Sequence, residues 1–287
     1  MDDPALQKIT RRDLRPLTEN FDEEDDKDGN LIFLYSTYGF VTREHVAYFG
    51  KSTLRKFNLT PPELKDTLKH IPDEDVYPDA PPTITPFPEP IDNERLYFKG
   101  PKLHEFFLGT GELATLTLQE AETLELLKRS PHPNIVGYHG CVIKRGRIVG
   151  LVLDRCKETL YYWMKGRQKP TIDIDACMNQ ITSAVRHLHS LGLAHNDLMP
   201  ANIMLDEHNN AIVVDFGSCQ PFGAKLITAG THGWIDEDFD TSAQHHDEYA
   251  LGKIRKWLEL KLANDGKQPD QDDEEAAQYL RTFPQKS

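Results

Sequence analysis

The chain has little of what marks secreted or membrane-spanning proteins. Only four cysteines occur in 287 residues, and none form a CxxC pair, so neither a disulfide framework nor a cysteine metal site is predicted. No apolar stretch approaches the roughly 20 residues that cross a bilayer. The opening segment MDDPALQKITRRDLR has no apolar core typical of a secretory signal. We therefore expect a soluble protein of the cytoplasm or the nucleus.

Positive charge is also scarce. The chain has 33 Lys and Arg residues against 46 Asp and Glu residues, a net charge of −13. A field of this sign repels phosphate backbones and anionic lipids, so neither nucleic acid nor a membrane is an expected partner. A single nucleotide can still bind, because one local cation and a metal ion outweigh a distant field.

Composition divides the chain into segments of different character. The predicted organisation is a disordered acidic N-terminus (1–30), an extension of strands and helices that ends in a Pro-rich connector (31–92), a regular core (93–263) and an acidic tail (264–287).

Within the extension, Leu31–Tyr35 is predicted as a strand, and one helix is expected to begin near Thr42. A second helix is predicted after Thr60, because Pro61 at the first helical position and Glu63 complete a capping box. The proline-rich stretch 77–90 is expected to be a stiff connector that lies across one lobe, in preference to a ligand for another domain.

The core alternates strand and helix patterns. The clearest helix is 173–191, whose apolar residues recur at helical spacing and which ends at Gly192. The other predicted elements are strands at 96–99, 135–142 and 148–153, a leucine-rich helix at 116–129, two short apolar runs at 203–205 and 211–214, and a final helix at 247–260.

The strongest chemical signal is the segment His195-Asn-Asp-Leu-Met-Pro-Ala-Asn202, followed thirteen residues later by Asp215-Phe-Gly217. Phosphoryl transfer requires an aligned acceptor hydroxyl, metal ions across the phosphates and cations near the developing charge. A carboxylate at Asp197 can orient and deprotonate the hydroxyl. Asn202 and Asp215 offer the oxygen ligands that Mg²⁺ prefers, and the apolar runs between them predict a hairpin that brings these two residues together.

These two segments resemble the catalytic loop, HRDLKPEN, and the metal-binding DFG loop of eukaryotic protein kinases. The resemblance covers roughly residues 93–260, and it is closest to an atypical group of fungal protein-kinase-like proteins. Further motifs of the superfamily follow in the same order: His132-Pro-Asn-Ile-Val136, Leu151-Val-Leu-Asp-Arg-Cys156, Gly230-Thr-His-Gly-Trp234 and Asp247-Glu-Tyr-Ala-Leu-Gly252.

The resemblance implies a nucleotide site for ATP. Leu153 would be the gatekeeper before the hinge, and backbone groups of Asp154 and Cys156 would meet the adenine edge. Lys99 would hold the α- and β-phosphates. A surface role for Lys99 is the alternative, because Lys102 lies close by in the sequence.

The leucine-rich helix should supply a glutamate partner for Lys99. Glu120 and Glu122 both have leucines four residues away on either side, so periodicity alone does not choose between them. The spacing to His132 favours Glu122, which is the predicted partner.

The chain also departs from the kinase pattern. No GxGxxG motif precedes Lys99, and Gly109-Thr-Gly111 is predicted as a turn before the helix. Asn196 replaces the arginine of the HRD motif, so activation by loop phosphorylation is not expected. Met199 replaces a lysine that is normally near the transferred phosphate, and Lys225 is a candidate substitute.

Together these features predict an α+β, two-lobed protein-kinase-like fold with an atypical N-lobe and a truncated C-lobe. The predicted reaction is transfer of the ATP γ-phosphate, with Mg²⁺, to a Ser/Thr hydroxyl of a protein substrate. Asp197 is the predicted base, and Asn202 and Asp215 are the predicted metal ligands. Thr231 matches the threonine typical of Ser/Thr kinases.

Two alternatives stay open. A small-molecule kinase of the aminoglycoside or choline phosphotransferase type would use the same loop on a small alcohol. A pseudokinase would retain the fold and bind without turnover.

Overall fold

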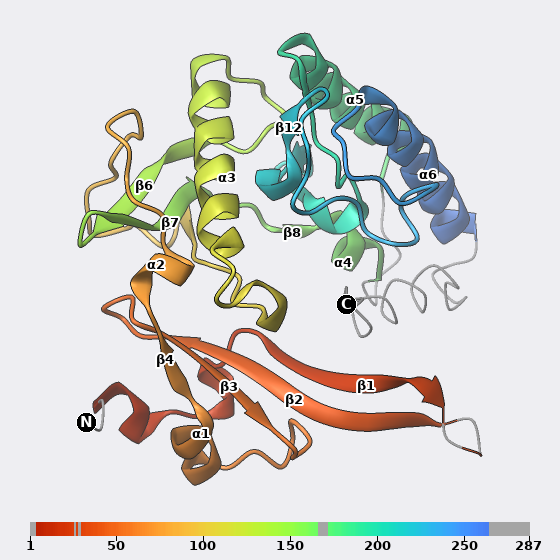
Figure 1. The fold of residues 1–287 in the computed structure, drawn as a ribbon. Helices are drawn as coiled ribbons and strands as arrows, with labels where there is room; N and C mark the ends of the chain where they lie inside the picture. Colours follow the sequence, from red (N-terminus) through yellow and green to blue (C-terminus); the bar gives the residue numbers. More distant parts are fainter. Residues whose placement is uncertain (1–3, 26, 28–29, 166–171, 264–287) are drawn as a thin grey trace.

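The computed structural model describes residues 4–25, 27, 30–165 and 172–263 in two lobes (Figure 1). The predicted acidic tail, 264–287, lies outside the described residues. The elements in chain order are β1 (Leu17–Asp25), β2 (Leu31–Val41), β3 (Ala47–Ser52), α1 (Pro61–Thr67), β4 (Lys69–Ile71), α2 (Asp73–Val76), β5 (Leu96–Lys99), α3 (Glu112–Arg129), β6 (Tyr138–Lys144), β7 (Arg147–Asp154), β8 (Glu158–Thr159), α4 (Leu160–Lys165), α5 (Ile174–Ser190), β9 (Leu193–Ala194), β10 (Ile203–Leu205), β11 (Ala211–Val213), β12 (Gln220–Pro221) and α6 (Gln244–Ala263). Short 3-10 turns lie at Pro4–Lys8, Arg11–Asp13, Glu105–Phe107, Pro200–Asn202 and Phe216–Ser218.

The N-terminal part of the chain forms an antiparallel sheet in the order β1-β2-β3-β4, the N-terminal sheet. The prediction of disorder over 1–30 is therefore wrong for Leu17–Asp25, where the edge strand β1 pairs with β2. An edge strand tolerates charged residues, because one of its sides faces water.

A helix beginning near Thr42 is also a wrong prediction. The hydroxyl of Thr42 accepts hydrogen bonds from the amides of Glu44 and Val46, and this closes the turn between β2 and β3. Helix α1 begins as predicted, with the Thr60 side chain accepting from the Glu63 amide.

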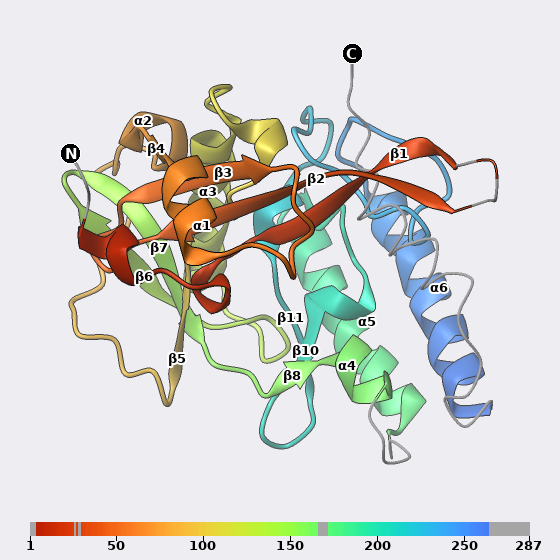
Figure 2. The same ribbon diagram turned by 90° about the horizontal axis from the view of Figure 1, so that it is seen from below.

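The N-lobe contains a second antiparallel sheet, in the order β5-β7-β6. Its apolar residues share a cluster with the N-terminal sheet, in which Leu103 is fully buried. Gly39 of β2 approaches this junction so closely that an added Cβ would lie 2.7 Å from the Arg15 carbonyl and 3.0 Å from the Leu103 side chain. The N-terminal sheet is therefore packed onto the N-lobe, as Figure 2 shows from below.

The Pro-rich connector lies along the outer edge of this second sheet. The Cys141 amide of β6 donates to the Thr85 carbonyl, and the Phe87 amide donates back to the Cys141 carbonyl. The amide of Thr85 also donates to the carboxylate of Glu125 on α3. The connector thus joins the sheet to α3 and occupies the edge that β6 would otherwise expose.

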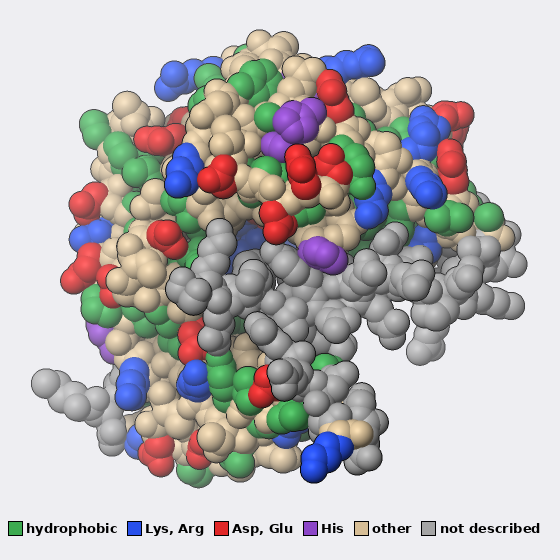
Figure 3. Space-filling model, turned by 45° about the vertical axis from the view of Figure 1, so that its right-hand side comes forward, with side chains coloured by type: hydrophobic (Ala, Val, Ile, Leu, Met, Phe, Trp, Pro, Cys, Tyr) green, Lys and Arg blue, Asp and Glu red, His purple; other side chains and the backbone are tan. Residues whose placement is uncertain are grey.

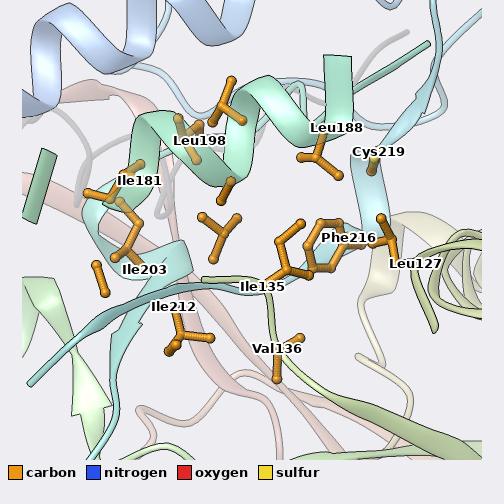
Figure 4. Packing of buried hydrophobic residues seen from close by; sticks show 14 of the residues in the cluster. Leu127, Ile135, Val136, Ile181, Leu188, Leu198, Ile203, Ile212, Phe216 and Cys219 are labelled. Carbon is orange, nitrogen blue, oxygen red and sulfur yellow. The ribbon is translucent and has the colours of Figure 1, made fainter. Parts of the chain in front are cut away.

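The C-lobe contains α4, α5 and α6 with the short hairpin β10–β11. Helix α5 begins at Ile174, one residue after the predicted start, with Asp173 as its N-cap, and packs beside α6 (Figures 1 and 2). Ile181 and Leu188 of α5 are fully buried, and Figure 4 shows them facing the cluster that contains Ile203 and Phe216. Because α5 and the β10–β11 hairpin share this cluster, the two elements that flank the loop 195–202 are packed together.

No helix in the described ranges has the length and the apolar character that a membrane span requires. On the described part of the face in Figure 3, Lys and Arg side chains lie among Asp and Glu side chains.

Candidate active site

The loop His195–Asn202 leaves the short strand β9 and enters β10. The β10–β11 hairpin pairs Ile203 with Val213, and the Val214 amide donates to the Asn202 carbonyl at 3.0 Å. This pairing brings Asp215 back beside Asn202, as the two apolar runs in the sequence predict.

Asp247 on α6 fixes the start of the loop His195–Asn202. Its fully buried carboxylate accepts hydrogen bonds from the backbone amides of His195 and Asn196, each at 2.9 Å. The His189 side chain lies 2.9 Å from the same carboxylate. The loop backbone is therefore tied to the longest helix of the C-lobe.

Asn196, which stands where the kinase pattern has arginine, is buried and joins several segments. Its amide nitrogen donates to the carbonyls of Ala194 and Ser218, each at 2.9 Å, and to the Ser242 hydroxyl at 3.0 Å. Its backbone is left-handed, with φ of 61°, a conformation that Asn tolerates better than most residues. Asn196 thus ties both ends of the segment that follows Asp215 to the loop.

Asp197 faces two hydrogen-bond donors. One carboxylate oxygen accepts from the Thr231 hydroxyl at 2.8 Å, and the other accepts from the Asn202 amide nitrogen at 3.1 Å. Burial raises the pKa of Asp197 to about 6, although the Thr231 hydrogen bond and the nearby His195 and Lys102 side chains lower it. A carboxyl with such a pKa is suited to exchange a proton near neutral pH.

Asp215 lies at the junction of the two lobes and meets two lysines. Lys99 at the end of β5 approaches one carboxylate oxygen at 2.8 Å, and Lys102 approaches the other at 2.7 Å. Burial opposes ionisation, but these two ammonium groups outweigh it and hold the pKa of Asp215 well below its usual range. The left-handed backbone of Asp215, with φ of 63°, turns the carboxylate out of the strand direction.

Glu120 on α3 completes the pair that sequence analysis assigned to Glu122. Its two oxygens lie 2.6 and 2.8 Å from the Lys99 ammonium, and the Phe216 amide donates to it at 3.1 Å. The prediction of Glu122 is wrong, because that side chain is on the exposed face of α3. Burial lowers the pKa of Lys99, but the attraction of Glu120 and Asp215 is stronger and raises it above its usual value.

Met199, which replaces the loop lysine, Lys225, the candidate substitute, and Lys102 lie in different places. Met199 packs against the C-lobe core. Lys225 is exposed and pairs through its backbone with Thr241. Lys102, which sequence analysis weighed only as an alternative to Lys99, is the one of the three whose side chain contacts Asp215.

The predicted hinge residues lie at the end of β7, which contains Leu153 and Asp154, and just beyond it, at Cys156. Leu153 is buried in the core cluster and pairs with Tyr97 of β5. The Asp154 amide donates to the Gly137 carbonyl, and its carboxylate lies 2.7 Å from the His139 ring. Cys156 is half-buried where the chain leaves the N-lobe. The roles of these three residues toward adenine stay predictions.

The donor set at Asn202 and Asp215 fits Mg²⁺. The amide nitrogen of Asn202 donates to the Asp197 carbonyl at 2.8 Å, which fixes that amide and leaves its oxygen as the possible metal ligand. Two ammonium groups already place positive charge at the Asp215 carboxylate. Within the described residues no group of three His, Cys, Asp or Glu side chains could hold a metal, whereas Mg²⁺ is commonly held by one or two protein carboxylates and substrate phosphates.

Phe216 links this site to the hydrophobic core. It is 1% exposed, and its ring lies 5.4 Å from the His195 ring. Figure 4 shows it beside Ile135. The packing fixes the chain immediately after Asp215, so the direction of the carboxylate is set by the core as well as by the lysines.

Comparison with known proteins agrees with this geometry. Residues 111–241 match the protein kinase domain family. The chain is 33% identical over 132 residues to the serine/threonine-protein kinase/endoribonuclease IRE1 of Hypocrea jecorina, a match that covers 39% of this chain and 10% of that protein. It is also 33% identical over 101 residues to the serine/threonine-protein kinase KIN4 of Saccharomyces cerevisiae, covering 34% of this chain and 12% of that protein.

Among solved structures, the kinase PK-1 of the Cydia pomonella granulovirus aligns with a TM-score of 0.44 and 21% identity, over 55% of this chain and 60% of that one. The matches to the two fungal kinases above span only about a tenth of the length of those proteins. The segment that matches the protein kinase domain family, residues 111–241, includes α3, the loop with Asp197 and the segment after Asp215. This part of the chain is therefore similar to a protein kinase domain, and the chain as a whole has an α+β fold.

Proposed function

We propose that this chain is an ATP-dependent phosphotransferase that acts on Ser/Thr hydroxyls of proteins. The observation that carries the proposal is the connected set of charges across the two lobes: Glu120 holds Lys99, and Lys99 reaches Asp215. On the C-lobe side, Asn202 contacts Asp197. These contacts support the proposed roles of Lys99 as a phosphate-binding cation, Asn202 and Asp215 as metal ligands and Asp197 as a base.

In the proposed reaction, the acceptor hydroxyl lies against Asp197. The Thr231 hydroxyl already donates to this carboxylate at 2.8 Å, so the site accommodates an aliphatic hydroxyl in that position. As the acceptor oxygen forms its bond to the γ-phosphorus, its proton passes to Asp197 and the bond to the ADP oxygen breaks. Mg²⁺, when bound, neutralises phosphate charge.

Lys99 serves the nucleotide in this scheme. Its side chain is 15% exposed and its ammonium group is oriented by Glu120, so it can contact the α- and β-phosphates without a large loss of side-chain freedom. Leu153, Asp154 and Cys156 are proposed to line the adenine end, because β7 ends at Asp154 and the chain passes from there between the lobes.

One observation favours a second function, a pseudokinase that binds without turnover. Both oxygens of Asp215 are engaged by lysines, and one oxygen of Asp197 is engaged by Thr231. These contacts could stabilise an inactive state, provided that nucleotide and metal do not replace them.

Nucleotide-dependent thermal stabilisation tests the proposal. Ligand at 100 times its Kd stabilises the folded state by about 2.7 kcal/mol, which for a chain of this size corresponds to a Tm increase of roughly 5–10 °C. Millimolar ATP with Mg²⁺ or Mn²⁺ should produce such an increase in the wild type. Asp215→Ala should remove its metal-dependent part.

Asp175→Ala is the matched control, since Asp175 is an exposed carboxylate on α5. It should keep the full shift. A wild-type protein without any shift at millimolar ATP and metal would contradict the nucleotide site. A normal shift without transfer to proteins or to a panel of small alcohols would favour the pseudokinase.

A further inference from the structure

Lys102 is the charged residue of this site that the proposed reaction does not yet use. It follows β5 by three residues, and its side chain is 73% exposed. Its backbone position is fixed by its neighbour, because Leu103 is fully buried between the N-terminal sheet and the N-lobe. The contact with Asp215 thus starts from an anchored backbone and uses a mobile side chain.

The two lysines on Asp215 differ in how firmly they are held. Lys99 is largely buried and bound by Glu120 as well as by Asp215. For Lys102, the contact with Asp215 is the ion pair that the described residues show. A metal ion that takes an oxygen of Asp215 would therefore displace Lys102 more easily than Lys99.

The site needs another cation when ATP is present. The loop His195–Asn202 contains neither Lys nor Arg. Lys99 and Lys102 face two carboxylates, Glu120 and Asp215, so these four side chains together carry no net charge. Without Lys102 they would carry one net negative charge, against a nucleotide–metal complex that is itself anionic.

Lys102 also lies near the place where phosphoryl transfer would occur. Its ammonium is 2.7 Å from Asp215, which the β10–β11 hairpin brings beside Asn202 at the end of the loop that carries Asp197. A cation at this position can face the equatorial oxygens of a phosphoryl group in transfer.

We propose that Lys102 is a second phosphate-binding cation, which leaves Asp215 when the magnesium complex of ATP binds and then contacts the phosphoryl group that is transferred. The inference rests on the proposed function. Lys102 forms and breaks no covalent bond: the phosphoryl group moves from the ADP oxygen to the acceptor oxygen, and the acceptor proton goes to Asp197.

Equilibrium binding to the full chain tests this role, with Mg-ATP, Mg-ADP and AMP as the probes. Lys102→Met should weaken Mg-ATP binding about tenfold to a hundredfold, the range of one charge-assisted hydrogen bond, and should leave AMP binding within about twofold. Lys102→Arg should restore most of the loss, because the charge and reach are similar. Lys256→Met, which alters an exposed lysine on α6, is the control and should bind like the wild type.

A single-turnover measurement at saturating Mg-ATP separates the bound complex from the transfer step. Lys102→Met should slow transfer at least tenfold even when fully loaded. If Lys102→Met bound Mg-ATP as tightly as the wild type or more tightly, Lys102 would be only a competitor of the metal and the inference would be overturned, while the proposed function would stand. If the wild type did not bind Mg-ATP, both would fall.

Discussion

Removing the charge of Glu120 while keeping its shape distinguishes the observed Lys99–Glu120 ion pair from the Lys99–Glu122 pair that the spacing to His132 favoured. In Glu120→Gln, Lys99 loses its carboxylate partner on α3. The side chain of Glu120 is 8% exposed and that of Lys99 is 15% exposed. Loss of one partner from a buried pair costs about 3–5 kcal/mol. Lys99 keeps Asp215, and the amide oxygen of Gln can still accept from Phe216, so the expected cost is about 2–3 kcal/mol.

The assay is urea unfolding of Glu120→Gln beside the matched variant Glu122→Gln. The first should lower the free energy of unfolding by the amount above and Tm by roughly 5–10 °C. The second, at an exposed position on the same helix, should stay within about 0.5 kcal/mol. Glu120→Gln should also raise the Kd for Mg-ATP, because Lys99 is then oriented by Asp215 alone.

Equal stability of the two variants, or a greater loss in Glu122→Gln, would refute this account of the ion pair. A double variant with Lys99→Met supplies the coupling. If Glu120 and Lys99 interact, the double variant should be clearly less destabilised than the sum of the single variants.

Three further outcomes follow from the geometry. Asn196→Ala removes the amide that donates to Ser218 and places Ala in a left-handed backbone conformation. The free energy of unfolding should therefore fall by about 2–4 kcal/mol, and proteolysis of the segment after Asp215 should accelerate. Unchanged stability in urea would contradict this. Because Asp197 must be ionised to accept a proton and burial raises its pKa to about 6, kcat should decrease as pH falls below about 6, and a flat pH profile between 5 and 8 would argue against this base. Gly39→Ala should destabilise by about 1–3 kcal/mol in thermal unfolding, because its Cβ would press on the Leu103 side chain, and a neutral effect would mean that the sheets adjust there.

The core of the fold was accessible from sequence because its signals are local. Helix α5 has an apolar face at helical spacing and the N-cap Asp173, and both of its predicted ends agree with the structure to within one or two residues. Gly111, predicted within a turn, is the N-cap of α3 with φ of 74°. Such patterns report directly on backbone conformation.

The N-terminal sheet was not accessible in the same way. Its edge strand β1 is rich in acidic residues and is held by pairing with β2. The sheet packs on the N-lobe through residues of β2, β3 and β4. These are contacts between distant parts of the chain, and local composition favours a disordered interpretation. The edge strand therefore illustrates tertiary structure that overrides local preference.

The residues of the candidate site also differ in whether local sequence or tertiary contacts determine their positions. The proximity of Asp197, Asn202 and Asp215 could be predicted because their spacing reflects one loop and one hairpin, whereas their roles stay predictions. Glu120 and Glu122 both satisfy the leucine periodicity, and only the rotation of α3 against β5 decides which carboxylate meets Lys99. The contacts of Asn196 with Ser218 and Ser242 involve residues 22 and 46 positions away, so no sequence window contains them.

The central claim is that Asp197 aligns and deprotonates an acceptor hydroxyl while Asn202 and Asp215 serve the metal. Transfer of radiolabelled γ-phosphate to generic protein acceptors, measured together with the Kd for Mg-ATP, tests it most directly in the wild type and in Asp197→Asn. The variant should lose about 10²–10⁴-fold in kcat with nearly unchanged nucleotide affinity, because the contact acts mainly in the transition state. If Asp197→Asn instead lost ATP binding but kept its rate per bound complex, or matched the wild type in both measurements, the assignment would be contradicted.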